Sequence, residues 1–260
     1  MPRRGVISSV NLKILHWDLE TAPMVSYHWR PKTEYIGQHL NIDQSFVMTW
    51  SAKWDGTPKK QVMHDCLTSE EMTSQDDSRI ISSMADLIRE ADVVVAHNGD
   101  RFDLRVLNTR VAQLQLEPLG PVDTIDTLKL AKASFAFPYN TLDHLASVFL
   151  GKRKIETTFD LWRAAYMGDE RAIRKLVRYC DSDVHLLEGV FHAMLPYVKN
   201  LRRLTDSDGF TPTCPTCGST DKQSRGTKRT KTMNYRQYQC TNCKRYYKGV
   251  LIGRSGQAGL

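Results

Sequence analysis

The sequence predicts an α/β protein in which helices flank a mixed sheet, followed by a small C-terminal module. Short apolar runs alternate with segments of helical spacing over roughly the first 200 residues. One run, within residues 92–97, is continuously apolar from Val93 to Ala96, as in a strand covered on both faces. Beyond residue 212 the composition changes to paired cysteines and many cations, which sets the module apart.

The predicted elements follow one another along the chain. Strand-like runs cover residues 12–19, 46–50 and 61–66, and helical spacing covers residues 70–90. The strand at 92–97 precedes a helix over 102–116, a strand over 122–126 and further helix. The last helix is the clearest, because apolar residues recur at three- and four-residue steps: Ile173, Leu176, Val177, Cys180, Val184, Leu187 and Phe191.

Composition excludes several classes of protein. Of the 260 residues, 41% are hydrophobic, which is enough for a core and excludes a collagen-like or disordered chain. No apolar run approaches the roughly 20 residues that span a bilayer. The first ten residues, MPRRGVISSV, lack the apolar stretch of a secretory signal. We therefore expect a cytoplasmic protein with no membrane partner.

The charge of +7 is unevenly distributed. Residues 211–260 contain ten Lys and Arg but one acid, Asp221, whereas residues 1–210 contain 26 basic and 28 acidic side chains. Such a basic tail favours a polyanionic partner, most plausibly nucleic acid, although a solubilising tail is the alternative. We place one domain at residues 1–205 and a basic module at 206–260, with a turn or linker at 205–209.

Asp18 and Glu20 form an Asp-x-Glu pair at the end of the first predicted strand. Side chains two apart emerge on one face of a strand, about 6.6 Å apart along it. Carboxylates held so close repel each other unless a cation lies between them. The alternative is a pair of solvated residues at a strand edge.

Asp103 follows the turn His97-Asn98-Gly99 and projects from the first turn of the next predicted helix. In that position Asp103 is a further candidate ligand for a cation. The alternative is that its negative charge only complements the dipole at the start of the helix. Tyr179 and Asp183 are four residues apart on the striped helix and so share a face, whereas Asp181 lies across the stripe. Surface carboxylates and a tyrosine beside the core are the alternative for this third group.

In this order, Asp-x-Glu, Asn-Gly-x-x-Phe-Asp-x-x-x-Leu and Tyr-x-x-x-Asp resemble the DEDD superfamily of 3′-5′ exonucleases. The resemblance covers about residues 10–195 and is to the tyrosine subgroup, which includes the proofreading domain of family B DNA polymerases. Asp126-Thr127, residues 141–146 and Gly151-Lys-Arg-Lys154 also match. The histidine subgroup would have His at position 178, where this chain has Arg178.

The resemblance implies a ribonuclease H-like fold with about five strands, and release of nucleoside monophosphates from a 3′ end. Asp18, Glu20, Asp103 and Asp183 would be its metal ligands. Four carboxylates make an oxygen-rich site that suits two Mg²⁺ or Mn²⁺ ions, which can stabilise the anionic groups of phosphodiester hydrolysis. By resemblance Tyr179 would orient the attacking water; with an ordinary pKa of about 10 it would not be a strong base.

Other polar and aromatic residues near these motifs have competing interpretations. His16 and His97 are expected to be core residues or neighbours of the ligands rather than ligands. Phe102 is expected to pack in the core, although resembling enzymes place apolar side chains here against the terminal base. Asn98 and Lys154 are further candidates for nucleic-acid contact, with a solvated loop as the alternative for residues 152–154.

Four of the six cysteines form two C-x-x-C pairs, Cys214 with Cys217 and Cys240 with Cys243. This spacing is a strong signature of one structural Zn²⁺ in a zinc ribbon; disulfides or a redox pair are the alternatives. Zinc would supply the folding free energy of so small a module. Cys66 and Cys180 are isolated and are expected in the core.

Cations and tyrosines are interleaved in the module. Cations neutralise phosphates and aromatic rings stack on bases, so we expect contact with nucleic acid; rings that only fill the ribbon are the alternative. The candidates for this contact are Arg229, Arg236, Tyr238 and Arg245.

The sequence thus favours a metal-dependent 3′-5′ exonuclease acting on DNA, with single-stranded 3′ ends preferred. A ribonuclease H-like endonuclease or an RNA exonuclease is one alternative, since sugar discrimination depends on the pocket around the 2′-OH. A non-catalytic nucleic-acid-binding protein is the other.

Overall fold

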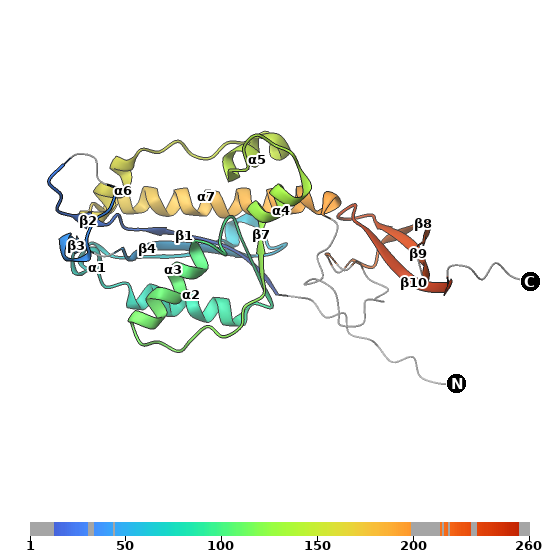
Figure 1. The fold of residues 1–260 in the computed structure, drawn as a ribbon, viewed down its shortest axis with the longest axis horizontal. Coiled ribbons are helices and arrows are strands. Elements are labelled where there is room, and N and C mark those ends of the chain that lie inside the picture. The colour runs from blue at the N-terminus through green and yellow to red at the C-terminus, as the bar shows by residue number, and fades with distance from the viewer. Residues whose placement is uncertain are drawn as a thin grey trace, which may run out of the picture. The chain divides into compact units, whose positions relative to one another are not determined.

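The computed structural model describes residues 13–30, 34–43, 45–198, 214, 216–217, 219–229 and 233–254 (Figure 1). The described residues form two compact units. Lys13–Lys129 and Phe137–Val190 make the first, and Leu130–Ala136 with residues from Phe191 on make the second. The first ten residues, the predicted linker at 205–209 and the predicted boundary at 205 lie outside the described residues.

The first unit is built on a mixed sheet, as predicted. Its described strands lie in the order β5-β4-β1-β6-β7. The central strand β1 is antiparallel to β4 and parallel to β6. The strand bounds are β1 Ile14–Thr21, β4 Val47–Trp54, β5 Met63–Cys66, β6 Val93–Ala96 and β7 Thr124–Asp126. A small ribbon of β2 (Val25–Ser26) and β3 (Asn41–Asp43) follows β1.

Helices cover both faces of this sheet: α7 lies along one face, and α2 and α3 lie on the other (Figure 1). The long α7 confirms the predicted apolar stripe, since Leu176, Cys180, Val184 and Leu187 are all buried. The helix bounds are α1 Ser69–Ser74, α2 Ser78–Glu90, α3 Asp103–Gln113, α4 Thr127–Ser134, α5 Leu142–Leu150, α6 Phe159–Tyr166 and α7 Glu170–Met194. Single 3₁₀ turns occur at Gln38–Leu40, Lys59–Gln61 and Leu195–Tyr197.

The predicted helical segment 70–90 is two helices rather than one. Thr68 and Glu71 cap α1 through a reciprocal capping box, and Gln75 ends it with a left-handed φ of 56°. Asp76 then accepts a hydrogen bond from the Ser78 amide at 3.0 Å, which supports the start of α2. Polar residues at positions 75–77 therefore interrupt a pattern that the apolar spacing alone does not resolve.

A buried ion pair fixes α2 and α3 to the sheet. Asp77 Oδ1 lies 2.6 Å from Arg110 Nη2, and Asp77 Oδ2 accepts the Val47 amide at 2.9 Å. The Asp77 side chain of this pair is fully buried. The contact therefore links the start of α2, the last turn of α3 and the first residue of β4.

The second unit contains a three-stranded antiparallel sheet in the order β10-β9-β8. Its strands are β8 Lys222–Arg229, β9 Met233–Cys240 and β10 Tyr246–Arg254. The hairpin expected between the cysteine pairs is β8–β9, and β10 adds a strand that the sequence did not indicate. Among the described residues, the helices are all too short or too polar to cross a membrane.

Candidate active site

Three carboxylates meet at the end of the central strand. Asp18 and Glu20 come from β1 and Asp183 comes from α7, and one oxygen of each lies within 4.8 Å of the others. The thiol of Cys180, on the same helix, lies 3.5 Å from the Asp18 carbonyl oxygen and so ties α7 to the strand. Residues that are 165 positions apart in the sequence thus share one small volume, which we call the acid cluster.

Asp103 lies beside this cluster at the start of α3. It is buried, and its Oδ1 accepts a hydrogen bond at 3.3 Å from the amide of Leu19, the residue between Asp18 and Glu20. The turn before it requires glycine, because a Cβ on Gly99 would lie 2.4 Å from the Ala96 Cβ. The sequence of the turn therefore delivers Asp103 to the strand that carries the other acids.

The acid cluster is poor in positive charge for the number of acids that it holds. Burial raises the pKa of Glu20 and of Asp103 to about 7. Burial, followed by the charges of Asp103, Glu20 and Asp183, raises the pKa of Asp18 well above its ordinary value. Burial also raises the pKa of Asp183, whose Oδ1 has no hydrogen-bond partner among the described residues. An unpartnered buried oxygen among carboxylates fits a divalent cation with oxygen ligands.

Lys154 supplies the counter-charge. Its ammonium lies 2.6 Å from Asp183 Oδ2 and 4.8 Å from the ring centre of Tyr179. The Tyr179 hydroxyl lies near both groups, where it lowers the pKa of Asp183 and raises that of Lys154. Burial raises the pKa of Tyr179 to about 12, so this hydroxyl stays protonated at neutral pH.

Trp162, on α6, is a member of the site that sequence reasoning missed. Its indole donates a hydrogen bond of 3.0 Å to Glu20 Oε2, and its ring meets that of Tyr179 edge-on at 5.4 Å. The predicted pairing of Tyr179 and Asp183 on one face of α7 is correct. No signal near Trp162 in the sequence points to it, because its partners come from β1 and α7.

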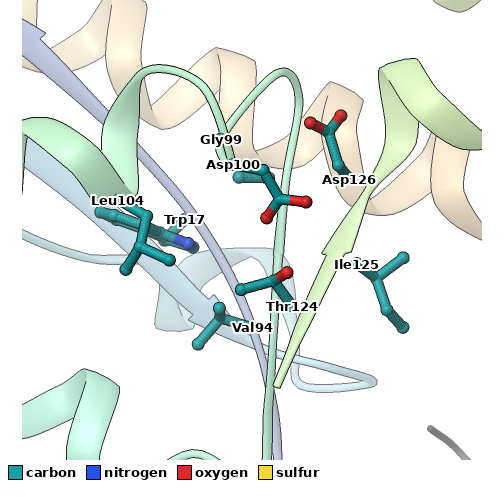
Figure 2. A pocket seen from close by; sticks show the side chains of 9 residues that line it. Trp17, Val94, Gly99, Asp100, Leu104, Thr124, Ile125 and Asp126 are labelled. Carbon is teal, nitrogen blue, oxygen red and sulfur yellow. The ribbon is translucent and has the colours of Figure 1, made fainter. Parts of the chain in front are cut away.

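A small cavity lies behind the turn that carries Asp103, lined by Trp17, Gly99, Asp100 and Asp126 among others (Figure 2). Its volume of about 10 Å³ is about the least that can hold a single water molecule. Asp126 Oδ1 accepts the amides of Asn98 and Leu128 at 3.0 and 2.9 Å, which joins the turn to the start of α4. The cavity is too small for a nucleotide.

Several predicted residues lie outside the acid cluster. Asp181, which its spacing places across the stripe from Asp183, accepts a hydrogen bond from the Ser51 hydroxyl at 2.7 Å. His16 is buried and bonds Asp55 at 2.8 Å, and His97 lies 2.9 Å from the Thr127 hydroxyl. The prediction that Phe102 packs in the core is wrong: its side chain is 44% exposed, because it precedes α3 at the surface.

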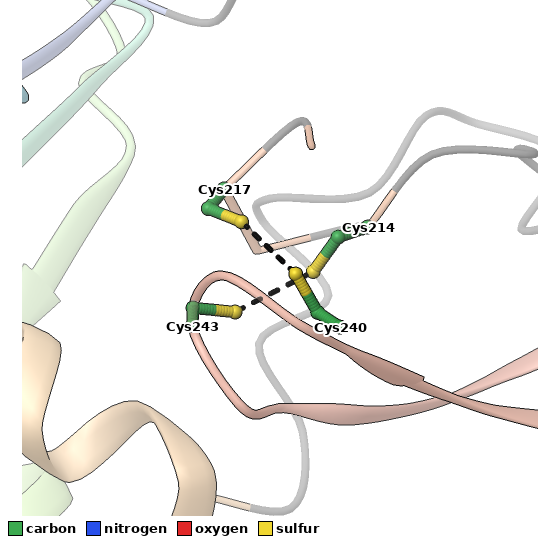
Figure 3. A group of neighbouring side chains, drawn as sticks. All are labelled: Cys214, Cys217, Cys240 and Cys243. Carbon is green, nitrogen blue, oxygen red and sulfur yellow. Dashed lines mark hydrogen bonds between the residues drawn. The ribbon is translucent and has the colours of Figure 1, made fainter. Parts of the chain in front are cut away.

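The four predicted zinc ligands form a second cluster, in which the sulfurs lie within 4.8 Å of one another (Figure 3). Cys214 Sγ lies 3.6 Å from Cys243 Sγ, and the same distance separates the sulfurs of Cys217 and Cys240. A disulfide needs about 2.05 Å, whereas a tetrahedral ion with Zn–S bonds near 2.3 Å separates its sulfurs by about 3.8 Å. The arrangement fits a metal site and not two disulfides.

The predicted nucleic-acid contacts of this module differ in exposure. Arg236 is exposed, and the side chain of Arg229 lies outside the described residues. Tyr238 is half-buried against Tyr247, with Lys222 Nζ 5.4 Å from its ring centre. Arg245 is 6% exposed and its guanidinium donates to the Leu195 carbonyl at 2.7 Å. Because it is turned inward, we leave Arg245 out of any nucleic-acid surface.

A mixed sheet between helices, with carboxylates gathered at the end of its central strand, defines a ribonuclease H-like protein. A family model described as the RNase_H superfamily matches residues 41–195, which is more than half of the chain. The chain therefore belongs to the RNase H superfamily, as its sequence motifs led us to expect. This fold supports a nuclease acting on nucleic acid. The match does not include the strand that carries Asp18 and Glu20.

Among solved structures, the chain is similar to the family B DNA polymerase from the hyperthermophilic archaeon Pyrobaculum calidifontis. The two are 18% identical with a TM-score of 0.49, over 72% of this chain and 26% of the polymerase. The chain thus spans about a quarter of that polymerase's length. No curated protein matches the sequence.

Proposed function

We propose that this protein is a metal-dependent 3′-5′ exonuclease that releases nucleoside monophosphates from single-stranded ends of DNA. The observation that carries the proposal is the meeting of Asp18, Glu20 and Asp183 within 4.8 Å, with Asp103 bonded to the same strand. Such a set of buried and half-buried acids is unstable when fully ionised unless cations neutralise it. Lys154 is the one counter-charge that the site provides among the described residues, and it offsets only part of this electrostatic cost.

The four carboxylates would hold two Mg²⁺ or Mn²⁺ ions, since all of their donors are oxygens. When bound, such ions would supply Lewis-acid chemistry, which can activate a water molecule and stabilise the charge on the phosphate and the leaving oxygen. Trp162 holds one oxygen of Glu20 through its hydrogen bond and leaves the other for a ligand. The Leu19 amide likewise donates a hydrogen bond to Asp103 Oδ1 and leaves the other oxygen of Asp103 for a metal ion.

Tyr179 would orient the attacking water through its hydroxyl. With its pKa raised to about 12, it acts as a hydrogen-bond partner and not as a base near neutral pH. The ring is fixed from two sides, by the edge contact with Trp162 and by the Lys154 ammonium. Phe102, which is exposed beside Asp103, and Asn98 in the preceding turn would contact the terminal nucleotide.

The C-terminal module, residues 206–260, would be a zinc ribbon that binds the nucleic acid. Its exposed cations support this role, with Arg236 on β9 as one contact and Arg229 as a second candidate. Tyr238 keeps a structural contact with Tyr247, so stacking on a base would use its remaining exposed surface.

The test is digestion of single-stranded DNA and RNA oligomers that carry a label at the 3′ end, with Mg²⁺ or Mn²⁺. We expect labelled mononucleotides from the first time point, and none in EDTA. Longer labelled fragments would indicate an endonuclease instead, faster digestion of RNA would reassign the substrate, and tight binding without turnover would indicate a non-catalytic protein.

A further inference from the structure

Four cations form a stripe on the outer face of α7. Arg171, Arg174, Lys175 and Arg178 are all exposed and recur at steps of three and four residues, which places them on one side of the helix. With a rise of about 1.5 Å per residue, the stripe is about 10 Å long. Arg174 lies 3.2 Å from Glu170, whereas within the described residues no carboxylate pairs with the side chains of Arg171, Lys175 or Arg178.

Two grooves run along this stripe. One, of about 1150 Å³, lies between α7, α6 and the segment just after Lys154, and includes Ile155, Thr157 and Leu161. The other, of about 590 Å³, lies towards β5 and includes His64. Arg171, Lys175 and Arg178 line both grooves, so the three unpaired cations form the ridge between them.

The acids of the larger groove are mostly engaged elsewhere. Asp169 Oδ1 accepts the amides of Arg171 and Ala172 at 2.7 and 3.3 Å, and Asp160 pairs with Arg163 at 2.9 Å. The third acid, Glu156, pairs with no cation among the described residues, so three unpaired cations face one unpaired acid. The groove therefore offers an excess of positive charge, two threonine hydroxyls and apolar side chains. These are the groups that bind the phosphates and sugars of a single strand without reading its sequence.

The groove and the acid cluster share their supporting elements. Lys154, which pairs with Asp183, directly precedes the groove wall at Ile155. Arg178 on the ridge directly precedes Tyr179, whose ring centre lies 4.8 Å from the Lys154 ammonium. A strand whose 3′ end lies at the acid cluster can thus continue over residues 155–158 into the groove.

We propose that this groove binds the phosphate backbone of the nucleic-acid strand, several nucleotides from the end held at the acid cluster. The proposal rests on the proposed function for the position of the 3′ end. Charge complementarity selects nucleic acid as the occupant, because three unpaired cations along about 10 Å match closely spaced phosphates.

Binding measured without catalysis tests this proposal. The full chain with Asp103→Asn, in EDTA, is titrated with fluorescent single-stranded DNA of about 3 and about 12 nucleotides over a range of salt concentrations. Arg171→Gln/Lys175→Gln/Arg178→Gln is compared with Lys59→Gln/Lys60→Gln/Arg105→Gln, which removes three exposed cations elsewhere. We expect the groove variant to lose about tenfold or more in affinity for the longer oligomer. Its log–log salt slope should fall by about 2, since each phosphate contact contributes about 0.7.

The short oligomer and the control variant should show little change. Equal losses in the two triple variants, or an equal loss for both oligomers, would overturn the proposal. In a parallel titration with an acidic peptide, a groove variant that loses affinity for the peptide but keeps its affinity for DNA would also overturn the proposal. That result would point to a protein partner. If the wild-type chain releases no nucleotide yet shows the groove-dependent slope, the proposed function fails and the groove stands. If the wild-type chain digests DNA and the groove variant has the same KM and the same salt slope as the wild type, the groove proposal is wrong and the proposed function is unaffected.

Discussion

The Lys154 ammonium lies 2.6 Å from Asp183 Oδ2, so the acid cluster carries its own counter-ion. Burial alone would lower the pKa of Lys154, but the Asp183 carboxylate and the Tyr179 hydroxyl outweigh it and the pKa is raised. In return, the charge of Lys154 lowers the pKa of Asp18, Glu20 and Asp183 against the effect of burial. The lysine therefore helps the acids stay ionised and ready to bind cations.

Replacing this lysine should shift the pH dependence of activity. In Lys154→Met the carboxylates lose a favourable charge, their pKa values rise, and the acidic limb of the pH–rate profile moves up by as much as about one pH unit. The control is Arg153→Met, because Arg153 pairs with Asp143 at the surface. An unshifted pH–rate profile in Lys154→Met would show that the lysine does not affect the ionisation of the acids.

Loss of one acid should abolish nucleotide release. Asp183→Asn removes a candidate ligand, and we expect the rate to fall by about 10³-fold or more with the circular dichroism unchanged. Asp181→Asn, two residues earlier on the same helix and bonded to Ser51, should keep most of the activity. Comparable activity in the two variants would contradict the proposed ligand set.

The metal-free protein should lose stability as the pH rises. Glu20 and Asp103 have folded-state pKa values of about 7, above the ordinary values of 4.5 and 3.8, so their contribution to stability is present below about pH 4 and is lost as the pH rises towards 7. In EDTA we expect the melting temperature at pH 8 to lie several degrees below that at pH 5. Excess Mn²⁺ should reverse this loss of stability at pH 8. If the melting temperatures in EDTA and in Mn²⁺ differ by the same amount at pH 5 and pH 8, that result would argue against a cation at these acids.

Trp162→Phe should have a smaller, specific effect. The ring contact with Tyr179 is preserved, but Glu20 loses the hydrogen bond that lowers its pKa. A hydrogen bond to a charged group is worth about 1.5–3 kcal/mol, so we expect kcat to fall by about tenfold and the Glu20 pKa to rise. NMR titration of the Glu20 side chain checks the second effect directly.

The cysteine cluster should bind one zinc ion per chain. Cys240→Ser should abolish binding, as measured by metal analysis, and unfold the β8–β10 sheet while the acid cluster remains active on short substrates. Cys66→Ser, on β5, should retain a full equivalent of zinc. Retention of zinc by Cys240→Ser would show that the ion, if present, lies elsewhere.

The sequence by itself was enough for features that depend on a local repeat. Side chains alternate along a strand and recur every 3.6 residues on a helix, so the shared faces of Asp18 with Glu20 and of Tyr179 with Asp183 follow from spacing alone. The two C-x-x-C pairs are predictable for the same reason, because each short turn brings its own sulfurs together.

Only the tertiary structure decided which of these local groups meet and what surrounds them. Lys154 pairs with Asp183, Trp162 bonds Glu20, and Arg245 turns inward to Leu195. Each of these contacts joins segments that are far apart in the sequence, and the choice depends on how whole helices pack against the sheet. Local periodicity fixes the direction of a side chain on its own element but contains no information about the element opposite, so these partners could be found only in the folded chain.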